Sequence, residues 1–164
     1  SREGERVLHD EYGMGSYLIA AAEDSADGRP ITINEVDIDN FIRAKGAIFS
    51  AIRLMTGHLG MDPSDLEHIL IAGGIGGGID FDKAVSIGML PDVDRSKYSY
   101  IGNSSLSGAY LMMISSQAEE KVAQIAQNMT YLELSNVPGY MDEFVACCFL
   151  PHTDARLFPS LTMK

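Results

Sequence analysis

Cysteine is scarce in this sequence: 164 residues contain only two, Cys147 and Cys148, and these are adjacent. Neighbouring side chains on a helix point about 100° apart, so the two thiols suit neither a disulfide nor a chelating pair. We expect both to be reduced thiols in a cytoplasmic protein. Iron–sulfur clusters and structural zinc need about four close ligands, so the sequence excludes either group on this chain alone.

Basic residues are also scarce, with 12 lysines and arginines against 23 acidic residues and a net charge of −11. Such a surface repels nucleic acid and anionic membranes, so neither is an expected partner. No apolar run reaches the roughly 18 residues that a membrane span needs. The charged first residues lack the apolar core of a signal peptide, which again indicates the cytoplasm.

The sequence does contain enough apolar residues to form a folded domain. Hydrophobic residues make up 46% and charged residues 21%, which is ordinary for globular proteins. The sequence shows no internal repeat, low-complexity segment or linker. We therefore expect one domain over residues 1–164.

Strands and helices are predicted to alternate after an initial hairpin. Strands are expected at residues 15–21, 30–33, 68–72, 98–101 and 130–134, and helices at 36–59, 81–88, 104–115 and 118–128. Residues 145–150 are expected to close a final helix. This order predicts an α/β fold with a mixed sheet, parallel in its later part, and helices on both faces. Asn34 followed by Asp37 marks the start of the long helix. The apolar run at 68–72 is typical of a strand buried on both faces, and the tail from Pro151 is expected to be irregular.

Glycine is concentrated directly after that apolar strand, with five glycines among the six residues from Gly73 to Gly78. Glycine lets the backbone approach a ligand closely, and a following helix N-terminus favours an anion. The spacing matches neither the P-loop nor a well-formed dinucleotide motif. By itself the cluster is either a ligand-contacting loop or a tight structural turn.

Two other features accompany the glycine cluster. Lys45 falls inside the apolar stripe of the long helix, so its ammonium group must pair, contact a ligand or extend to solvent. Gly102, Asn103 and Ser104 form a second strand-to-helix junction, which suits either a phosphate or ordinary helix capping. Because ligands of open sheets gather at the carboxyl ends of parallel strands, Gly73 and Gly102 should lie at the same edge.

The segment from Ile69 to Gly76 resembles the adenosine motif of the actin, sugar-kinase and heat-shock-chaperone superfamily. Residues 43–45 resemble the chaperone segment that reaches the adenosine, and residues 105–109 resemble the helix start after the last strand. The resemblance implies the second half of an actin-like ATPase (ribonuclease H-like) domain. It places nucleotide contacts at Lys45, Gly73, Gly74, Ile75, Gly76, Gly102, Asn103 and Ser104. We expect the Lys45 ammonium within one side-chain length of the loop at 73–76.

Within that superfamily the sequence is most similar to the reductive activators of corrinoid proteins. The matching segments are residues 31–33, 37–38, 44–48, 72–77, 87–91, 102–109, 131–135 and 158–159. Members of that family use ATP to drive electrons from an iron–sulfur domain onto corrinoid cobalt, which returns Co(II) to Co(I). The resemblance implies a partial site for ATP and magnesium. The implied partner is a corrinoid protein or a corrinoid-dependent methyltransferase, with a homodimer as a further alternative.

Parts of the family pattern are missing from these 164 residues, namely the iron–sulfur domain and the first half of the ATPase domain. The resemblance therefore implies a C-terminal subdomain of a longer multidomain protein, with the cluster in the missing N-terminal domain. We expect this chain alone to be inactive. Two other functions stay open: the activator of a radical dehydratase, and a non-catalytic module for dimerisation or partner docking.

Overall fold

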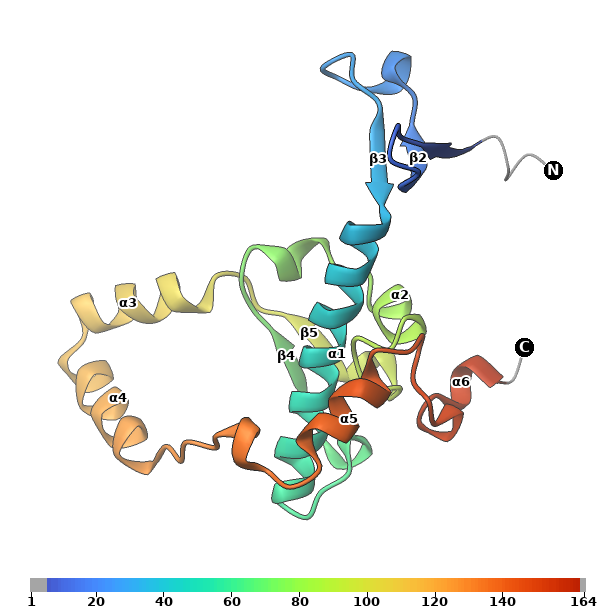
Figure 1. The fold of residues 1–164 in the computed structure, drawn as a ribbon. Coiled ribbons are helices and arrows are strands. Elements are labelled where there is room, and N and C mark those ends of the chain that lie inside the picture. Colours follow the sequence, from blue (N-terminus) through green and yellow to red (C-terminus); the bar gives the residue numbers. More distant parts are fainter. Residues whose placement is uncertain (1–5, 163–164) are drawn as a thin grey trace. The chain divides into compact units, whose positions relative to one another are not determined.

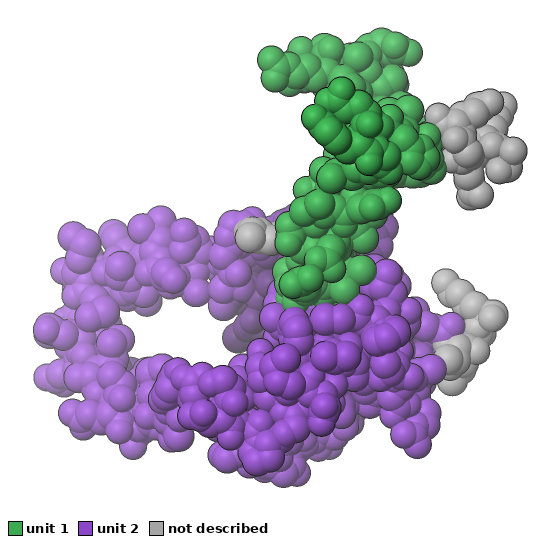
Figure 2. Space-filling view, viewed as in Figure 1, with its two compact units in different colours: residues 1–45 green, residues 46–164 purple. Residues whose placement is uncertain are grey.

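The computed structural model describes residues 6–162, which Figure 1 shows as a ribbon. The chain divides into two compact units, Ser1–Lys45 and Gly46–Lys164, coloured separately in Figure 2. The boundary falls inside the long helix α1 (Glu35–His58). Strands and helices alternate after the initial antiparallel strands, so the predicted α/β class is confirmed.

The first unit holds an antiparallel sheet that precedes α1. The predicted hairpin is present, and a further short strand pairs with it. The sequence pattern did not reveal that strand, because three residues are too few to show an alternation. The Asp10 side chain closes the first turn by accepting hydrogen bonds from the backbone N–H groups of Tyr12 and Met14. The strand order is β1 (Val7–His9), β2 (Gly15–Ala20) and β3 (Ile31–Asn34).

Helix α1 begins at Glu35, one residue before the predicted start, and the predicted cap is present. The Asn34 side-chain oxygen accepts from the Asp37 N–H at 2.8 Å, and the Asp37 carboxylate accepts from the Asn34 N–H at 3.0 Å. This reciprocal pair satisfies backbone donors that a helix start leaves open. The helix ends at His58, one residue before the predicted end.

The second unit contains a parallel strand pair and the remaining helices. Strand β4 (Ile69–Ile71) pairs with β5 (Tyr98–Tyr100). Among residues 6–162 the antiparallel and parallel parts of the predicted mixed sheet are therefore two separate sheets. No helix within these residues is long and apolar enough to cross a bilayer. The helices are α2 (Phe81–Ser86), α3 (Ser104–Ile114), α4 (Ser116–Asn128), α5 (Tyr140–Cys147) and α6 (Pro159–Thr162).

The hydrophobic core of the second unit extends into the C-terminal tail. Phe158 is 1% exposed, and its ring centroid lies 5.3 Å from that of Phe49 on α1. This burial explains why the tail, predicted to be irregular, instead forms a 3₁₀ turn at Ala155–Leu157 and then α6. The buried core residues are Phe49, Ala84, Val85, Leu90, Tyr98, Cys147 and Phe158.

Near the C-terminus one predicted element is wrong and the end of another differs. Residues 130–134 have the composition of a strand but form none; Tyr131 is 82% exposed, and a 3₁₀ turn follows at Leu134–Asn136. Residues 145–150 were expected to close a final helix, and they do so in part: helix α5 begins at Tyr140 and ends at Cys147, before the expected end. Its start depends on Gly139, whose φ of 82° turns the chain into the helix.

Part of the apolar surface of the second unit is uncovered. Leu70 on β4 is 60% exposed, so the prediction that this strand is buried on both faces is wrong. Helix α3 has no buried residue and no charged one, and Met113 is 86% exposed. Short helices in water gain most of their stability from packing, so we expect this surface to contact further protein.

Candidate functional site

The loops that follow β4 and β5 meet at the carboxyl ends of the two strands. The Gly73 N–H donates to the Gly102 carbonyl over 2.9 Å, and the Ile101 N–H donates to the Ile71 carbonyl over 2.9 Å. These bonds continue the parallel pairing beyond both strands and hold the loops side by side. The prediction that Gly73 and Gly102 share one sheet edge is confirmed.

Two of the loop glycines have backbone angles that favour glycine. Gly73 has a φ of 93° and Gly102 a φ of 72°. For other residues this left-handed region costs about 1–2 kcal/mol, because Cβ approaches the carbonyl oxygen. The sharp turns after both strands therefore explain these two glycines without any ligand.

Backbone conformation does not explain why residue 74 is glycine. Its φ of −62° and ψ of −36° suit any residue, and a Cβ built there would meet no atom within 4 Å. A Cβ at Gly73 would also meet nothing within 4 Å. The space beside these two residues is open, which lets a ligand lie directly on the backbone.

Gly76 and Gly77, in contrast, lie close against the side chains of the sheet. A Cβ at Gly76 would be 2.8 Å from Ile71 Cγ2, and one at Gly77 would be 3.1 Å from the Tyr100 hydroxyl oxygen. The predicted contact residue Gly76 therefore has a packing reason to be glycine. One part of the loop rests on the sheet and the other part is open.

The remaining predicted residues of this edge belong to the helix start. The Asn103 side chain accepts from the Leu106 N–H at 3.0 Å, so its capping interpretation is confirmed. Ser104 is the first residue of α3, and its N–H donates to the Gly102 carbonyl. The loop at Gly73 is thereby tied to the N-terminus of α3, whose dipole favours anions. Ile75 begins a 3₁₀ turn, and its side chain lies outside the described part of the structure.

Lys45 is fully buried on α1, at 0% exposed, so the interpretation that its ammonium extends into solvent is wrong. Lys45 belongs to the first unit and the glycine loop to the second. Its expected proximity to the loop at 73–76 stays a prediction. Arg43, from the same segment, pairs with Asp39 at 2.8 Å on the helix surface.

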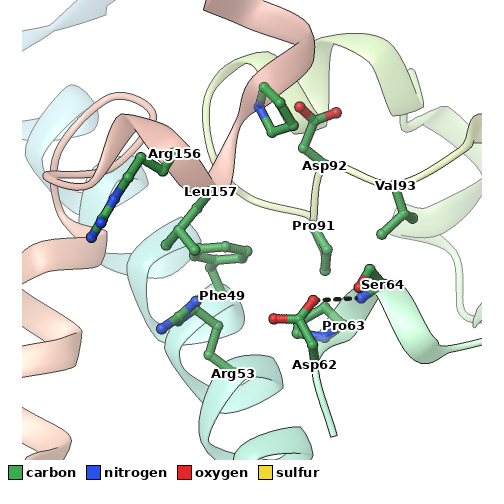
Figure 3. Close-up of a pocket in the computed structure, with 11 residues that line it drawn as sticks. Phe49, Arg53, Asp62, Pro63, Ser64, Pro91, Asp92, Val93, Arg156 and Leu157 are labelled. Atoms are coloured by element: carbon green, nitrogen blue, oxygen red, sulfur yellow. Dashed lines mark hydrogen bonds between the residues drawn. The ribbon is translucent and has the colours of Figure 1, made fainter.

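A cavity of about 190 Å³ lies at the opposite end of the strand pair, and Figure 3 shows its lining. Its walls include Asp62, which comes before β4, and Asp92, which comes before β5. Both carboxylates have partners: Asp62 accepts from the Ser64 N–H at 2.9 Å, and Asp92 accepts from the Ser160 N–H at 2.7 Å. These polar groups hold the fold together, and ligands of parallel strands bind at the other, carboxyl end.

A polar cluster centred on Glu143 of α5 was not predicted from the sequence. Its Oε1 accepts a hydrogen bond from Arg53 Nε at 2.5 Å and lies 3.7 Å from His152 Nε2. The Cys147 thiol lies 3.8 Å from the same oxygen. Glu143, Cys147 and His152 place one ligand atom each within 4.8 Å of one another, close enough for a metal ion. The sequence feature that could have pointed to this cluster is the i, i+4 spacing of Glu143 and Cys147, which places both side chains on one face of a helix.

The histidine tautomer argues against a metal at this cluster. His152 Nδ1 accepts a hydrogen bond from the Asp154 N–H at 2.9 Å. In the neutral ring the proton then sits on Nε2, the atom nearer Glu143, and a protonated nitrogen cannot ligate a metal. The Arg53 guanidinium also already neutralises the carboxylate. We interpret the cluster as an ion-pair network that fixes α5 against α1.

Replacing Glu143 with alanine is expected to lower the free energy of unfolding by about 2–3 kcal/mol, because the partly buried Arg53 guanidinium loses its carboxylate partner. The neighbouring Asp142 is exposed, so Asp142→Ala is the matched control and should change stability by less than about 0.5 kcal/mol. Urea unfolding of both variants measures the difference. Equal stabilities would contradict the proposed network.

Comparison with known proteins identifies the family. Residues 1–162 match the family model described as the C-terminal domain of RACo, the ASKHA domain. The chain belongs to this family. It is 31% identical over 136 residues to the corrinoid activation enzyme RamQ of Eubacterium limosum. The aligned residues cover 83% of this chain and 23% of RamQ.

A solved structure agrees with this assignment. It is described as a reductive activator for corrinoid, iron–sulfur protein, and it is 44% identical with a TM-score of 0.88. The match covers 96% of this chain and 25% of the activator. The chain thus spans about a quarter of the length of these two relatives. The predicted resemblance and the actin-like fold are confirmed.

Proposed function

We propose that the chain is the adenosine-binding portion of an ATP-dependent activator that returns Co(II) corrinoid proteins to Co(I). The open backbone at Gly73 and Gly74 carries this proposal, because the fold itself gives Gly74 no reason to be glycine. Its position at the carboxyl end of the parallel pair agrees with nucleotide binding. The family of the chain supports the same function.

In this proposal the chain orients the nucleotide and does not perform the chemistry. The adenosine lies against Gly73 and Gly74, and the N-terminus of α3 favours the anionic phosphates of the nucleotide. Lys45 is proposed to contact the nucleotide as well. The phosphates, magnesium and the attacking water need groups from the other half of a closing cleft. The iron–sulfur cluster that supplies electrons is proposed to belong to another domain of the full-length protein.

The 164-residue chain alone is expected to bind adenosine nucleotides weakly and to show no ATP hydrolysis. It contributes only the adenosine side of the cleft, so most phosphate contacts are missing. Isothermal titration with ATP and magnesium, together with a phosphate-release assay, measures both properties. Hydrolysis that survives purification and disappears in Gly74→Asp would reveal a complete site and contradict this expectation.

The proposed partner is a corrinoid protein or a corrinoid-dependent methyltransferase. The solved relative is described as acting on a corrinoid, iron–sulfur protein, which supports this class of partner. A docking or homodimerisation module is the second candidate function, and the exposed apolar surface of α3 favours it. Nucleotide binding separates the two candidates, because a docking module needs none.

A further inference from the structure

We propose that Tyr100 positions the nucleotide loop, an inference that rests on the adenosine-binding function proposed above. Tyr100 is the last residue of β5 and lies beside Ile71 in the parallel register. Its hydroxyl donates a hydrogen bond to the Gly73 carbonyl over 2.9 Å. Nothing in the local sequence pattern links Tyr100 to the glycines, so this role was not predicted from the sequence.

The Tyr100 ring also determines where the second half of the loop lies. A Cβ at Gly76 would be 3.1 Å from Tyr100 Cε2, and one at Gly77 would be 3.2 Å from Tyr100 Cε1. Both distances are tighter than ordinary van der Waals contact, so a side chain at either position would push the loop off the ring. Tyr100 therefore holds the loop at two points, by its hydroxyl at Gly73 and by its ring at Gly76 and Gly77.

The hydrogen bond to Gly73 has a direct consequence for Gly74. The peptide unit that joins them is planar and trans, so the Gly73 carbonyl and the Gly74 N–H point in opposite directions. Fixing the carbonyl on Tyr100 aims the Gly74 N–H away from the tyrosine. Two consecutive glycines offer little resistance to rotation of this peptide unit. The Tyr100 hydroxyl thus selects one orientation of the Gly74 N–H, the donor beside the open space at Gly73 and Gly74.

The test compares two tyrosine-to-phenylalanine variants in the full-length protein. Tyr98, two residues earlier on β5, donates its hydroxyl to the Pro91 carbonyl at 2.6 Å, and burial raises the pKa of Tyr98 to about 12. Tyr98→Phe removes the same kind of hydrogen bond at the opposite end of the strand. It is expected to lower the melting temperature and leave nucleotide affinity unchanged.

Tyr100→Phe is expected to weaken binding of ATP, ADP and adenosine by the same factor, about three- to tenfold, the value of one lost hydrogen bond. The loss of affinity is the same for all three ligands because the loop contacts the nucleoside, which all three contain. In the nucleotide-free protein, amides of residues 73–78 should exchange hydrogen faster in Tyr100→Phe and not in Tyr98→Phe.

Three outcomes would overturn the inference. The first is unchanged nucleotide affinity in Tyr100→Phe, the second is unchanged hydrogen exchange at residues 73–78, and the third is an equal loss of affinity in Tyr98→Phe. Each of these leaves the proposed function intact when the wild-type protein binds ATP. A wild-type protein that binds no ATP would overturn the proposed function itself, and the inference with it.

Discussion

Replacing Gly88 with alanine is expected to destabilise the second unit by more than about 3 kcal/mol. Gly88 has a φ of 73°, and a Cβ there would lie 2.0 Å from the carbonyl oxygen of Pro151. The same Cβ would be 2.7 Å from the Pro151 carbonyl carbon. Both atoms are backbone, and the segment that contains them leads to the buried Phe158, so relief would require the core to move.

A second glycine provides the matched control. Gly57 lies near the end of α1, where a Cβ would meet no atom within 4 Å. Alanine has a higher helix propensity than glycine, so Gly57→Ala should raise stability by up to about 1 kcal/mol. Urea unfolding measures both variants. A Gly88→Ala protein as stable as the wild type would show that residues 88 and 151 do not meet as described.

Replacing Gly74 with aspartate is expected to reduce the ATP affinity of the full-length protein by more than about 100-fold, because the new carboxylate fills the proposed nucleoside space and repels an anionic ligand. The free energy of unfolding should change by less than about 0.5 kcal/mol. Ordinary backbone angles and open surroundings at Gly74 allow the side chain without strain. Isothermal titration and urea unfolding measure the two effects.

Gly78→Asp is the control for charge in the same loop. A Cβ at Gly78 also meets no atom within 4 Å, so the fold should accept this change equally well. ATP affinity is expected to stay within about threefold of the wild type, because Gly78 lies at the far end of the loop. Equal losses in the two variants would mean that loop charge, and not contact at Gly74, controls binding.

Features with local causes were predictable from the sequence. The start of α1 depends on a reciprocal cap between Asn34 and Asp37, three residues apart. The shared edge of Gly73 and Gly102 follows from the general geometry of parallel strands, and the hydrogen bond between them agrees with it. The cap is visible within four residues, and the shared edge follows from two strand-to-helix junctions that are each visible in a short stretch of sequence.

Features that depend on distant contacts were not predictable. The apolar run of β4 did not reveal which of its faces the chain covers, and Leu70 lies on the open one. Residues 130–134 have strand composition, but strand formation needs a neighbour at the right edge. The Glu143 cluster joins Arg53 and His152, which are 90 positions and 9 positions away in the sequence. Only folding brings these partners together.

The most direct measurement of where adenine binds is photo-crosslinking of an azido-substituted ATP to the full-length protein, followed by peptide mapping. Labelling is expected within residues 73–78 or 100–104, and excess unlabelled ATP should remove it. Labelling confined to residues 62–64 or 91–93 would contradict the proposed adenosine site. It would place the nucleotide in the cavity at the amino ends of β4 and β5 instead.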